Sequence, residues 1–334
     1  MKHFKSILKY SITLIIAFGI LWFVFRDIDL VVLFENLKSA NFTYVYISIG
    51  FSLLSHLLRG YRWTLLLSPI GYKVNPFRAF IAVMVGYFAN LLLPRMGEVT
   101  RCAILKKTDK VAIPASLGTV ISERILDLII LLILIFVTII IEFKVLKDFL
   151  YESFSAAFNN INFSNTLIYL GIILFIILAI IVLLIWKREF LKSLHLYQKI
   201  RPFIIDLING LMSIRKVEKK FAFLISTLLI WVLYYLMSYI IIFSFETTSN
   251  LDFFAGLSIL MAGGLGMAAP VQGGIGTYHA FVSGILLLYG INKADGVLFA
   301  TLLHTSQFIS VTVFGGISFI ISIFLNKNPN GNKG

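Results

Sequence analysis

The chain has 334 residues, of which 59% are hydrophobic and only 13% are charged. Together with a mean hydropathy of +0.94, this composition excludes an ordinary soluble domain, in which about 25% of residues are charged. Several apolar runs are long enough to cross about 30 Å of hydrocarbon, so we predict a polytopic membrane protein. The net charge of +13 favours positive cytoplasmic loops over a nucleic-acid partner. Cys102 is the only cysteine, which excludes an internal disulfide and a cysteine-based metal cluster.

The first apolar run, residues 7–25, follows a lysine-rich start. No small-residue cleavage site follows it, so we predict an uncleaved first helix. A second helix is expected over residues 44–67, with Arg59 and Arg62 on one face near its end. We favour snorkelling of these two side chains to the inner headgroups. The alternative is that Arg59 faces a central site.

The next apolar segment, residues 76–93, ends in the sequence L-P-R-M-G-E. If it crossed the membrane, the basic residues after it would lie outside, against the positive-inside rule. A re-entrant hairpin removes this conflict, with a break at residues 94–97 and a return along residues 98–106. Proline and glycine are expected at such a break, and irregular backbone at this depth must be covered by protein or water.

A long helix is predicted over residues 114–141, with Glu123 and Asp127 four residues apart on one face. An outer loop is expected over residues 142–165. The alternation of basic and apolar residues between 191 and 214 predicts a segment that lies along the inner surface. Further spanning helices are expected over residues 166–186, 221–245 and 296–325.

A second interrupted region begins at residues 253–269, breaks at the sequence A-P-V-Q-G-G-I-G and continues at residues 280–289. The two hairpin regions, about 76–106 and 253–290, would then enter the membrane from opposite sides. Paired interrupted segments of this kind indicate the central site of a transporter. We therefore predict an all-α polytopic membrane protein with about six spanning helices, two re-entrant helical hairpins and an inverted repeat. Chance similarity around a Pro-Gly break is the alternative.

The predicted organisation is one transmembrane domain over residues 1–325 and a disordered tail over residues 326–334, which is polar and rich in glycine and asparagine. The positions of the basic loops predict a multi-pass protein of the cell membrane with both termini in the cytoplasm.

Ionisable residues gather around the first break, where charge at membrane depth either marks a pathway or pairs with an opposite charge. Five arginines face three carboxylates in this region, an excess of two positive charges: Arg59, Arg62, Arg95, Arg101, Arg124, Glu98, Glu123 and Asp127. In one interpretation, Glu98 and Glu123 pair with arginines and pin the hairpin to the helix 114–141. In the other, the surplus guanidinium groups bind a phosphate, which their planar fork suits.

The predicted substrate-binding site combines residues near the first break with residues near the second. Backbone N–H groups after Gly97 and Gly274 would add donors to it. His279 and His304 are expected to be hydrogen-bonded packing residues, with proton carriage as the alternative. The candidate site residues are Arg95, Glu98, Arg101, Glu123, Arg124, Asp127, Gln272, Gly273, Gly274 and His279.

Three motifs, L-P-R-M-G-E-V-T-R (93–101), I-S-E-R-I-L-D (121–127) and P-V-Q-G-G-I-G (270–276), resemble the flippase-like family, also called the lysylphosphatidylglycerol synthase transmembrane region family. With spacing and hydropathy, the resemblance covers nearly the whole chain. It implies an integral membrane protein that moves lipids or lipid-linked molecules between leaflets. One branch of the family adds a soluble synthase domain; we see none in this sequence and expect no lysyl transfer. His279 stands where the family commonly has glutamate, so a carboxylate role at this position is in doubt.

The leading hypothesis is a flippase-like transporter of an anionic lipid or lipid-linked molecule, without a cofactor, a metal or a nucleic-acid partner. The sequence contains no metalloprotease motif, nucleophile elbow or P-loop, so we predict no catalytic residues. Two alternatives stay open. One is a polytopic transferase with a lipid-linked donor, for which Asp27 and Asp29 are the candidate acids; the other is a structural membrane protein that transports nothing.

Overall fold

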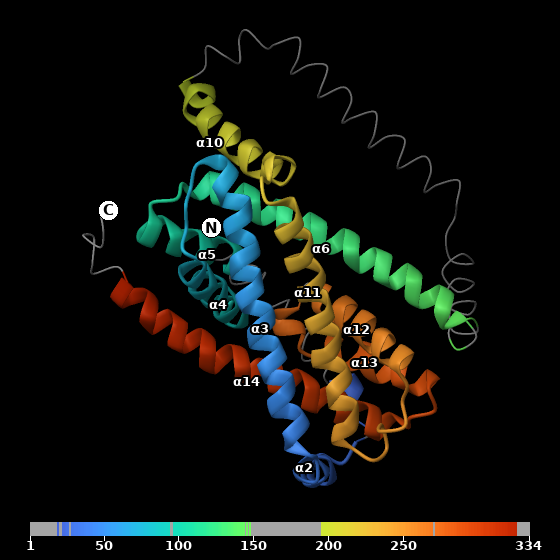
Figure 1. Cartoon of the computed structure of the whole chain (residues 1–334). Coiled ribbons are helices and arrows are strands. Elements are labelled where there is room, and N and C mark those ends of the chain that lie inside the picture. The colour runs from blue at the N-terminus through green and yellow to red at the C-terminus, as the bar shows by residue number, and fades with distance from the viewer. Residues whose placement is uncertain are drawn as a thin grey trace.

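The structure is a computed structural model in which residues 22–26, 28–93, 96–143, 195–269 and 271–325 are described, together with the single positions 19, 145 and 147. These residues form helices and turns and no β-strand (Figure 1), which confirms the predicted all-α fold class. Most of the predicted first helix, the predicted helix 166–186, most of the loop 142–165 and the tail lie outside the described residues.

A first set of helices precedes residue 142, and three of them begin at a side chain that caps the first turn. Such a cap accepts a hydrogen bond from an N–H group that the helix itself leaves unpaired. Asp29, Asn41 and Asn75 cap α2, α3 and α4 in this way. The set comprises α2 (Leu30–Lys38), α3 (Phe42–Leu67), the 3-10 helix η1 (Ser68–Ile70), α4 (Pro76–Leu92), α5 (Met96–Asp109) and α6 (Ile113–Ile141).

A second set of helices follows residue 194. Two of its helices begin three residues earlier than the sequence predicts. α14 starts early because the Asn292 side chain accepts a hydrogen bond from the N–H of Asp295 at 2.9 Å, and α13 starts directly after the glycine-rich break. The set comprises α10 (His195–Leu211), η2 (Met212–Lys216), α11 (Lys220–Tyr239), η3 (Ile240–Ser244), α12 (Phe253–Ala268), η4 (Gln272–Gly274), α13 (Thr277–Leu288) and α14 (Lys293–Leu325).

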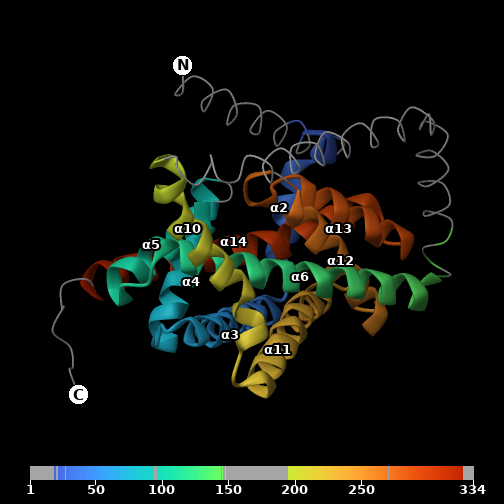
Figure 2. The same ribbon diagram turned by 90° about the horizontal axis from the view of Figure 1, so that it is seen from above.

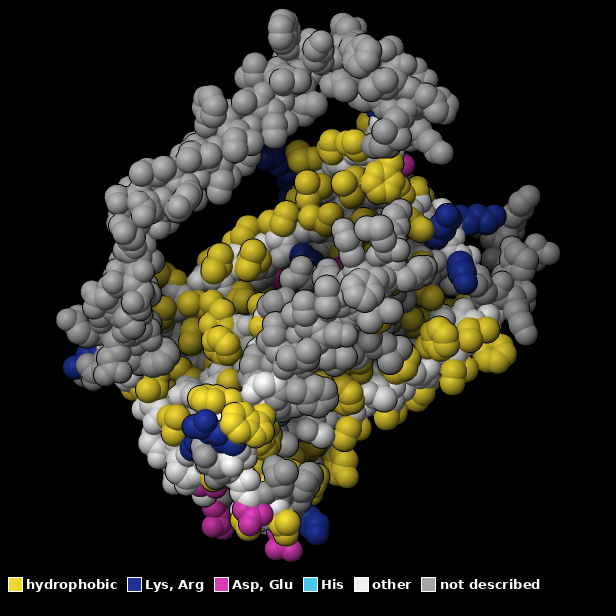
Figure 3. All heavy atoms as spheres, turned by 180° about the vertical axis from the view of Figure 1, so that it is seen from behind, with side chains coloured by type: hydrophobic (Ala, Val, Ile, Leu, Met, Phe, Trp, Pro, Cys, Tyr) yellow, Lys and Arg dark blue, Asp and Glu magenta, His cyan; other side chains and the backbone are white. Residues whose placement is uncertain are grey.

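The two ends of the helix bundle differ in charge. α3 ends and α11 begins at what we call the basic end, which carries Lys73, Lys106, Lys107, Lys110, Arg215, Lys216, Lys219 and Lys220. α3 begins at the opposite, acidic end, where the N–H of Asn41 donates to the Ser244 carbonyl at 3.0 Å. Acidic side chains gather at that end of the surface (Figure 3), and the loops there carry Asp29, Glu35, Glu246, Asp252 and Asp295.

The first hairpin, α4 and α5, opens toward the basic end. The Arg78 guanidinium in the first turn of α4 lies 3.1 Å from the carboxylate of Asp109, the last residue of α5. Near the tip, the N–H of Gly97 donates to the Asn90 side chain at 2.7 Å, so the two helices pack together directly beside the break. Residues 94 and 95 of the break lie outside the described residues.

The second hairpin, α12 and α13, opens toward the acidic end. The hydroxyl groups of Tyr289, after α13, and Ser258, on α12, are hydrogen-bonded at 2.7 Å. Near the tip, the Thr277 hydroxyl donates to the carbonyl of Gly266 at 2.8 Å. The backbone explains why the break is rich in glycine: φ is 59°, 71° and 84° at Gly273, Gly274 and Gly276, in the region that only glycine enters without strain.

The tips of the two hairpins meet inside the bundle. A Cβ atom built on Gly273 would lie 3.9 Å from the Cδ2 atom of Leu91. α4 packs against α14, and α12 packs against α6, so each hairpin contacts the long helix that follows the other one. α3 and α11 pack together and run in opposite senses (Figures 1 and 2). If each helix of the first set is replaced by its counterpart in the second set, the same kinds of contact result. This is the inverted relation that the two breaks predict.

Three described helices are long and apolar enough to cross a membrane: Ile113–Ile141, Lys220–Ser244 and Lys293–Leu325. α4, α12 and α13 are apolar but shorter, as a re-entrant hairpin requires. α6 exposes ten large apolar side chains; Phe136, for example, is 66% exposed, which fits a surface that faces lipid. The total of six spans stays a prediction. The expected surface segment forms α10, which packs on α6 where Gly210 meets Gly118.

The crossing of α3 and α4 gives a first testable prediction. A Cβ atom on Gly60 would lie 2.6 Å from the backbone nitrogen of Phe80, so Gly60→Ala must push the helices apart. We expect it to lower the free energy of unfolding by about 1–3 kcal/mol, measured by denaturation in detergent micelles. The control is Gly50→Ala on the same helix, where a new Cβ atom meets nothing within 4 Å. Equal losses in both variants would contradict the prediction.

Candidate functional site

The centre of the candidate site is Glu123, a fully buried residue of α6 that accepts hydrogen bonds from three arginines. Its Oε1 atom accepts from Nη2 of Arg59 at 2.6 Å and from Nη2 of Arg62 at 3.1 Å. Its Oε2 atom accepts from Nη1 of Arg101 at 3.1 Å. A single carboxylate therefore joins α3, α5 and α6.

Asp127 completes the network one helical turn after Glu123. Its two oxygens accept from Nη2 of Arg59 at 2.9 Å and from Nη2 of Arg62 at 2.8 Å. The two acids are four residues apart and the two arginines are three apart, so each pair occupies one helix face and the two faces meet. We call Arg59, Arg62, Arg101, Glu123 and Asp127 the ion cluster.

Polar and aromatic groups from other helices surround the ion cluster. On α11, the Tyr234 hydroxyl accepts from Arg59 at 2.7 Å and the Thr227 hydroxyl accepts from Arg62 at 3.5 Å. The Arg101 guanidinium lies 4.8 Å from the centre of the Trp63 ring, and the indole N–H of Trp63 donates to Thr119 at 2.8 Å. These contacts fix the guanidinium groups in position without adding negative charge.

Arg101 retains binding capacity that the described residues do not use. Its side chain is 4% exposed, and its Nε and Nη2 atoms are buried without a hydrogen-bond partner in the described part of the chain. A buried N–H group without a partner is unfavourable, so these two donors are suited to a ligand oxygen.

Arg124 and Glu98 form a second, more exposed pair, which we call the rim pair. The Nε atom of Arg124 lies 3.8 Å from Oε1 of Glu98, and the two side chains are 40% and 29% exposed. The hairpin is therefore pinned to α6 twice, by Arg101 with Glu123 and by Arg124 with Glu98, which agrees with the neutralisation interpretation of these charges.

The predicted residues of the second break lie in a separate group around α14. The Nε2 atom of His304 lies 2.8 Å from the Gly273 carbonyl, and the rings of His279 and His304 are 5.0 Å apart. His304 is thus hydrogen-bonded, as expected. The Nδ1 atom of His279 is buried without a partner among the described residues.

The structure thus brings together only part of the predicted site. Five of the predicted residues belong to the ion cluster or the rim pair: Glu98, Arg101, Glu123, Arg124 and Asp127. No hydrogen bond or ion pair between described residues joins them to Gly273, Gly274 or His279; the hairpin tips alone adjoin. Arg95, Pro270 and the side chain of Gln272 lie outside what the structure describes.

The favoured interpretation of Arg59 and Arg62 is wrong. Their side chains are 3% and 0% exposed, so they do not extend to the headgroups but bind the acids of α6. Their spacing of three residues correctly predicted a shared face. It did not predict which helix that face would meet, and nothing in the sequence identified Tyr234 or Thr227 as neighbours.

Of the two candidate acids of the transferase alternative, the described one, Asp29, has a local structural role away from the ion cluster. The Asp29 carboxylate accepts hydrogen bonds from the N–H groups of Val31 at 2.8 Å and Val32 at 3.3 Å, which makes it the N-cap of α2. Asp27 lies outside the described residues.

The fold and the ion cluster define an all-α integral membrane protein that holds a buried charge network between a re-entrant hairpin and two long helices. The chain belongs to the family described as the lysylphosphatidylglycerol synthase TM region, whose sequence model matches residues 10–315. The family resemblance that the three motifs predict is therefore confirmed.

Two relatives of this chain are membrane proteins of Methanocaldococcus jannaschii. UPF0104 membrane protein MJ1595 is 29% identical over 189 residues, which is 56% of this chain and 52% of the relative. UPF0104 membrane protein MJ1078 is 26% identical over 254 residues, which is 74% of this chain and 99% of the relative. The first match thus spans about half of that relative's length. No solved structure matches the chain.

Proposed function

We propose that this protein is a flippase-like transporter that moves an anionic lipid or lipid-linked molecule between the leaflets of the cell membrane. The observation that carries the proposal is the charge of the ion cluster and the rim pair together. Four guanidinium groups face three carboxylates, which leaves an excess of one positive charge if all are ionised. A guanidinium fork can bind two oxygens of a phosphate ester at once, so such a lipid anion suits these groups.

The exposure of the charged groups supports a route for the headgroup. Arg124 is partly exposed between Ile121 and Ile125, which are themselves exposed apolar residues of α6. A headgroup that leaves the lipid phase would meet Arg124 first and the unused donors of Arg101 next. Its acyl chains would stay against the apolar face of α6, so the protein would have to enclose only the polar part of the lipid.

The inverted arrangement of the helices supports a mechanism of alternating access, in which the ion cluster opens to one side of the membrane at a time. The hairpins enter from opposite ends and meet at Leu91 and Gly273, so a shift of one set of helices against the other would open the cluster to one side at a time. We propose that the basic end and both termini face the cytoplasm, as the positive-inside rule requires.

The test is reconstitution in vesicles with fluorescent phosphatidylglycerol or fluorescent phosphatidylcholine in one leaflet. We expect the anionic probe to change leaflet faster than in protein-free vesicles and faster than the zwitterionic probe, with no new lipid product. A new glycolipid or phospholipid would instead support the transferase alternative. No movement of either probe and no product would refute transport of such lipids.

A further inference from the structure

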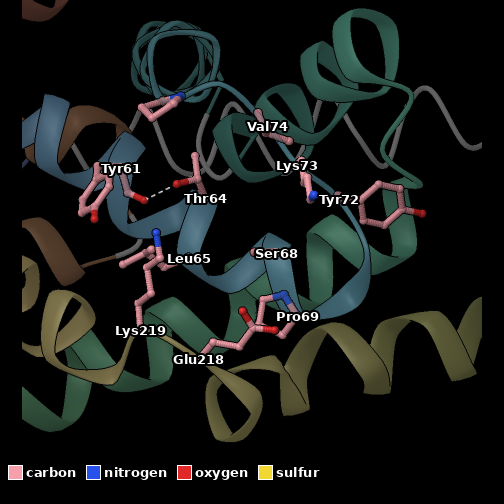
Figure 4. Close-up of a pocket in the computed structure, with 11 residues that line it drawn as sticks. Tyr61, Thr64, Leu65, Ser68, Pro69, Tyr72, Lys73, Val74, Glu218 and Lys219 are labelled. Atoms are coloured by element: carbon pink, nitrogen blue, oxygen red, sulfur yellow. Dashed lines mark hydrogen bonds between the residues drawn. The ribbon is translucent and has the colours of Figure 1, made fainter. Parts of the chain in front are cut away.

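A groove lies at the basic end, outside the ion cluster and the rim pair. It has a volume of about 270 Å³ and is lined by the last turns of α3, the loop before α4 and the residues that precede α11 (Figure 4). Its lining includes the polar side chains of Thr64, Lys73, Glu218 and Lys219.

The groove carries positive charge that described residues do not neutralise. Lys73 and Lys219 line it from different segments, and neither forms a salt bridge within 4.0 Å with a residue in the described ranges. Figure 4 shows the Lys219 ammonium group near Tyr61 and Leu65, while the Glu218 carboxylate lies at the Pro69 end of the groove. Two cations against one acid leave the lining with an excess of positive charge.

Neutral donors add to this preference for an anion. α11 begins beside Lys219, and no side chain caps its first turn. The unpaired N–H groups at a helix N-terminus carry partial positive charge and favour an anion.

An apolar layer separates the groove from the ion cluster. Leu65 and Leu66 follow Arg62 by one helical turn and pack with Val217 and Phe223. Leu65 also lines the groove. Along α3, the order is therefore the ion cluster, the apolar layer and then the groove at the basic end.

We propose that the groove is a second anion site, which binds the phosphate of a lipid headgroup from the leaflet at the basic end before the headgroup reaches Arg124 and Arg101. This inference rests on the proposed function, because it gives the groove the role of an entry site. The same donors would suit the phosphate of a small soluble ester, so the test compares both sources.

The test uses Thr64→Cys, which places one accessible thiol in the groove, since the single native cysteine, Cys102, is fully buried. The readout is the rate of reaction with a water-soluble maleimide in detergent. Short-chain phosphatidylglycerol, at about ten times its Kd, is expected to slow the reaction about tenfold, and short-chain phosphatidylcholine is not. Protection by glycerol phosphate but not by the lipid would assign the site to a soluble ester and overturn the entry role.

Charge removal provides the matched control. Lys73→Gln with Lys219→Gln should abolish protection, whereas Lys106→Gln with Lys107→Gln, which removes equal charge at the same end, should preserve it. Equal protection by phosphatidylcholine, or equal loss in both double variants, would overturn the proposal. The two experiments can fail separately. Lipid movement in vesicles without protection of the thiol would refute the anion site in the groove but not the transporter. Protection of the thiol without lipid movement would refute the transporter and the entry role but would leave an anion site in the groove.

Discussion

Glu123→Gln is expected to lower the free energy of unfolding by about 3–5 kcal/mol, the loss typical of removing one partner from a buried ion pair. The substitution keeps the size of the side chain but removes the charge that three guanidinium groups share. Arg59 and Arg62 would retain Asp127 as their only acid among the described residues, and Arg101 would lose the one acid that it contacts there. Denaturant unfolding in detergent micelles, followed by tryptophan fluorescence, measures the loss.

The matched control is Glu98→Gln, which removes the same charge from the rim pair. Glu98 is 29% exposed and lies 3.8 Å from Arg124, so screening should limit its effect to less than about 1 kcal/mol. Adding Arg101→Gln to Glu123→Gln should recover part of the stability, because it removes a buried cation that has lost its partner. Similar small losses for Glu98→Gln and Glu123→Gln would mean that the ion cluster does not hold the helices together.

The second large effect is expected on transport. Arg101→Lys should slow the movement of fluorescent phosphatidylglycerol about tenfold or more, since a lysine keeps the charge but lacks the planar fork of two parallel N–H groups that binds one phosphate through two oxygens. The lysine ammonium can still pair with Glu123, so the free energy of unfolding should change little. Rates of lipid movement and unfolding curves are measured on the same preparation, which separates loss of binding from loss of folded protein.

Two variants control this result. Arg78→Lys makes the same substitution in an ion pair at the basic end, where Arg78 lies 3.1 Å from Asp109, and should leave the rate unchanged. Arg124→Gln with Glu98→Gln removes the rim pair as a neutral unit. If the double variant restores the rate that Arg124→Gln alone loses, the rim pair is structural and Arg124 is not a phosphate ligand. An unchanged rate in Arg101→Lys would likewise remove Arg101 from the proposed site.

The sequence by itself determined the features that depend on local physics. Hydropathy identified a membrane protein, and the predicted helix over residues 76–93 agrees with α4 (Pro76–Leu92) because proline, asparagine and the break mark its limits. The two interrupted regions indicated hairpins of opposite sense, since a first segment that crossed the membrane would leave the basic residues after it outside. The spacing of Glu123 and Asp127 placed both acids on one helix face before any neighbour was known.

Only the tertiary structure decided what that face would meet. A spacing of three or four residues places two side chains on the same face of their helix. Which residues that face contacts depends on how the helices cross. α3 approaches α4 closely at Gly60, and the resulting packing turns Arg59 and Arg62 toward α6 rather than toward the headgroups. In an apolar surrounding, two arginines are far more stable beside two carboxylates than alone. The position of those carboxylates is a property of the packed bundle, which no single segment of the sequence contains.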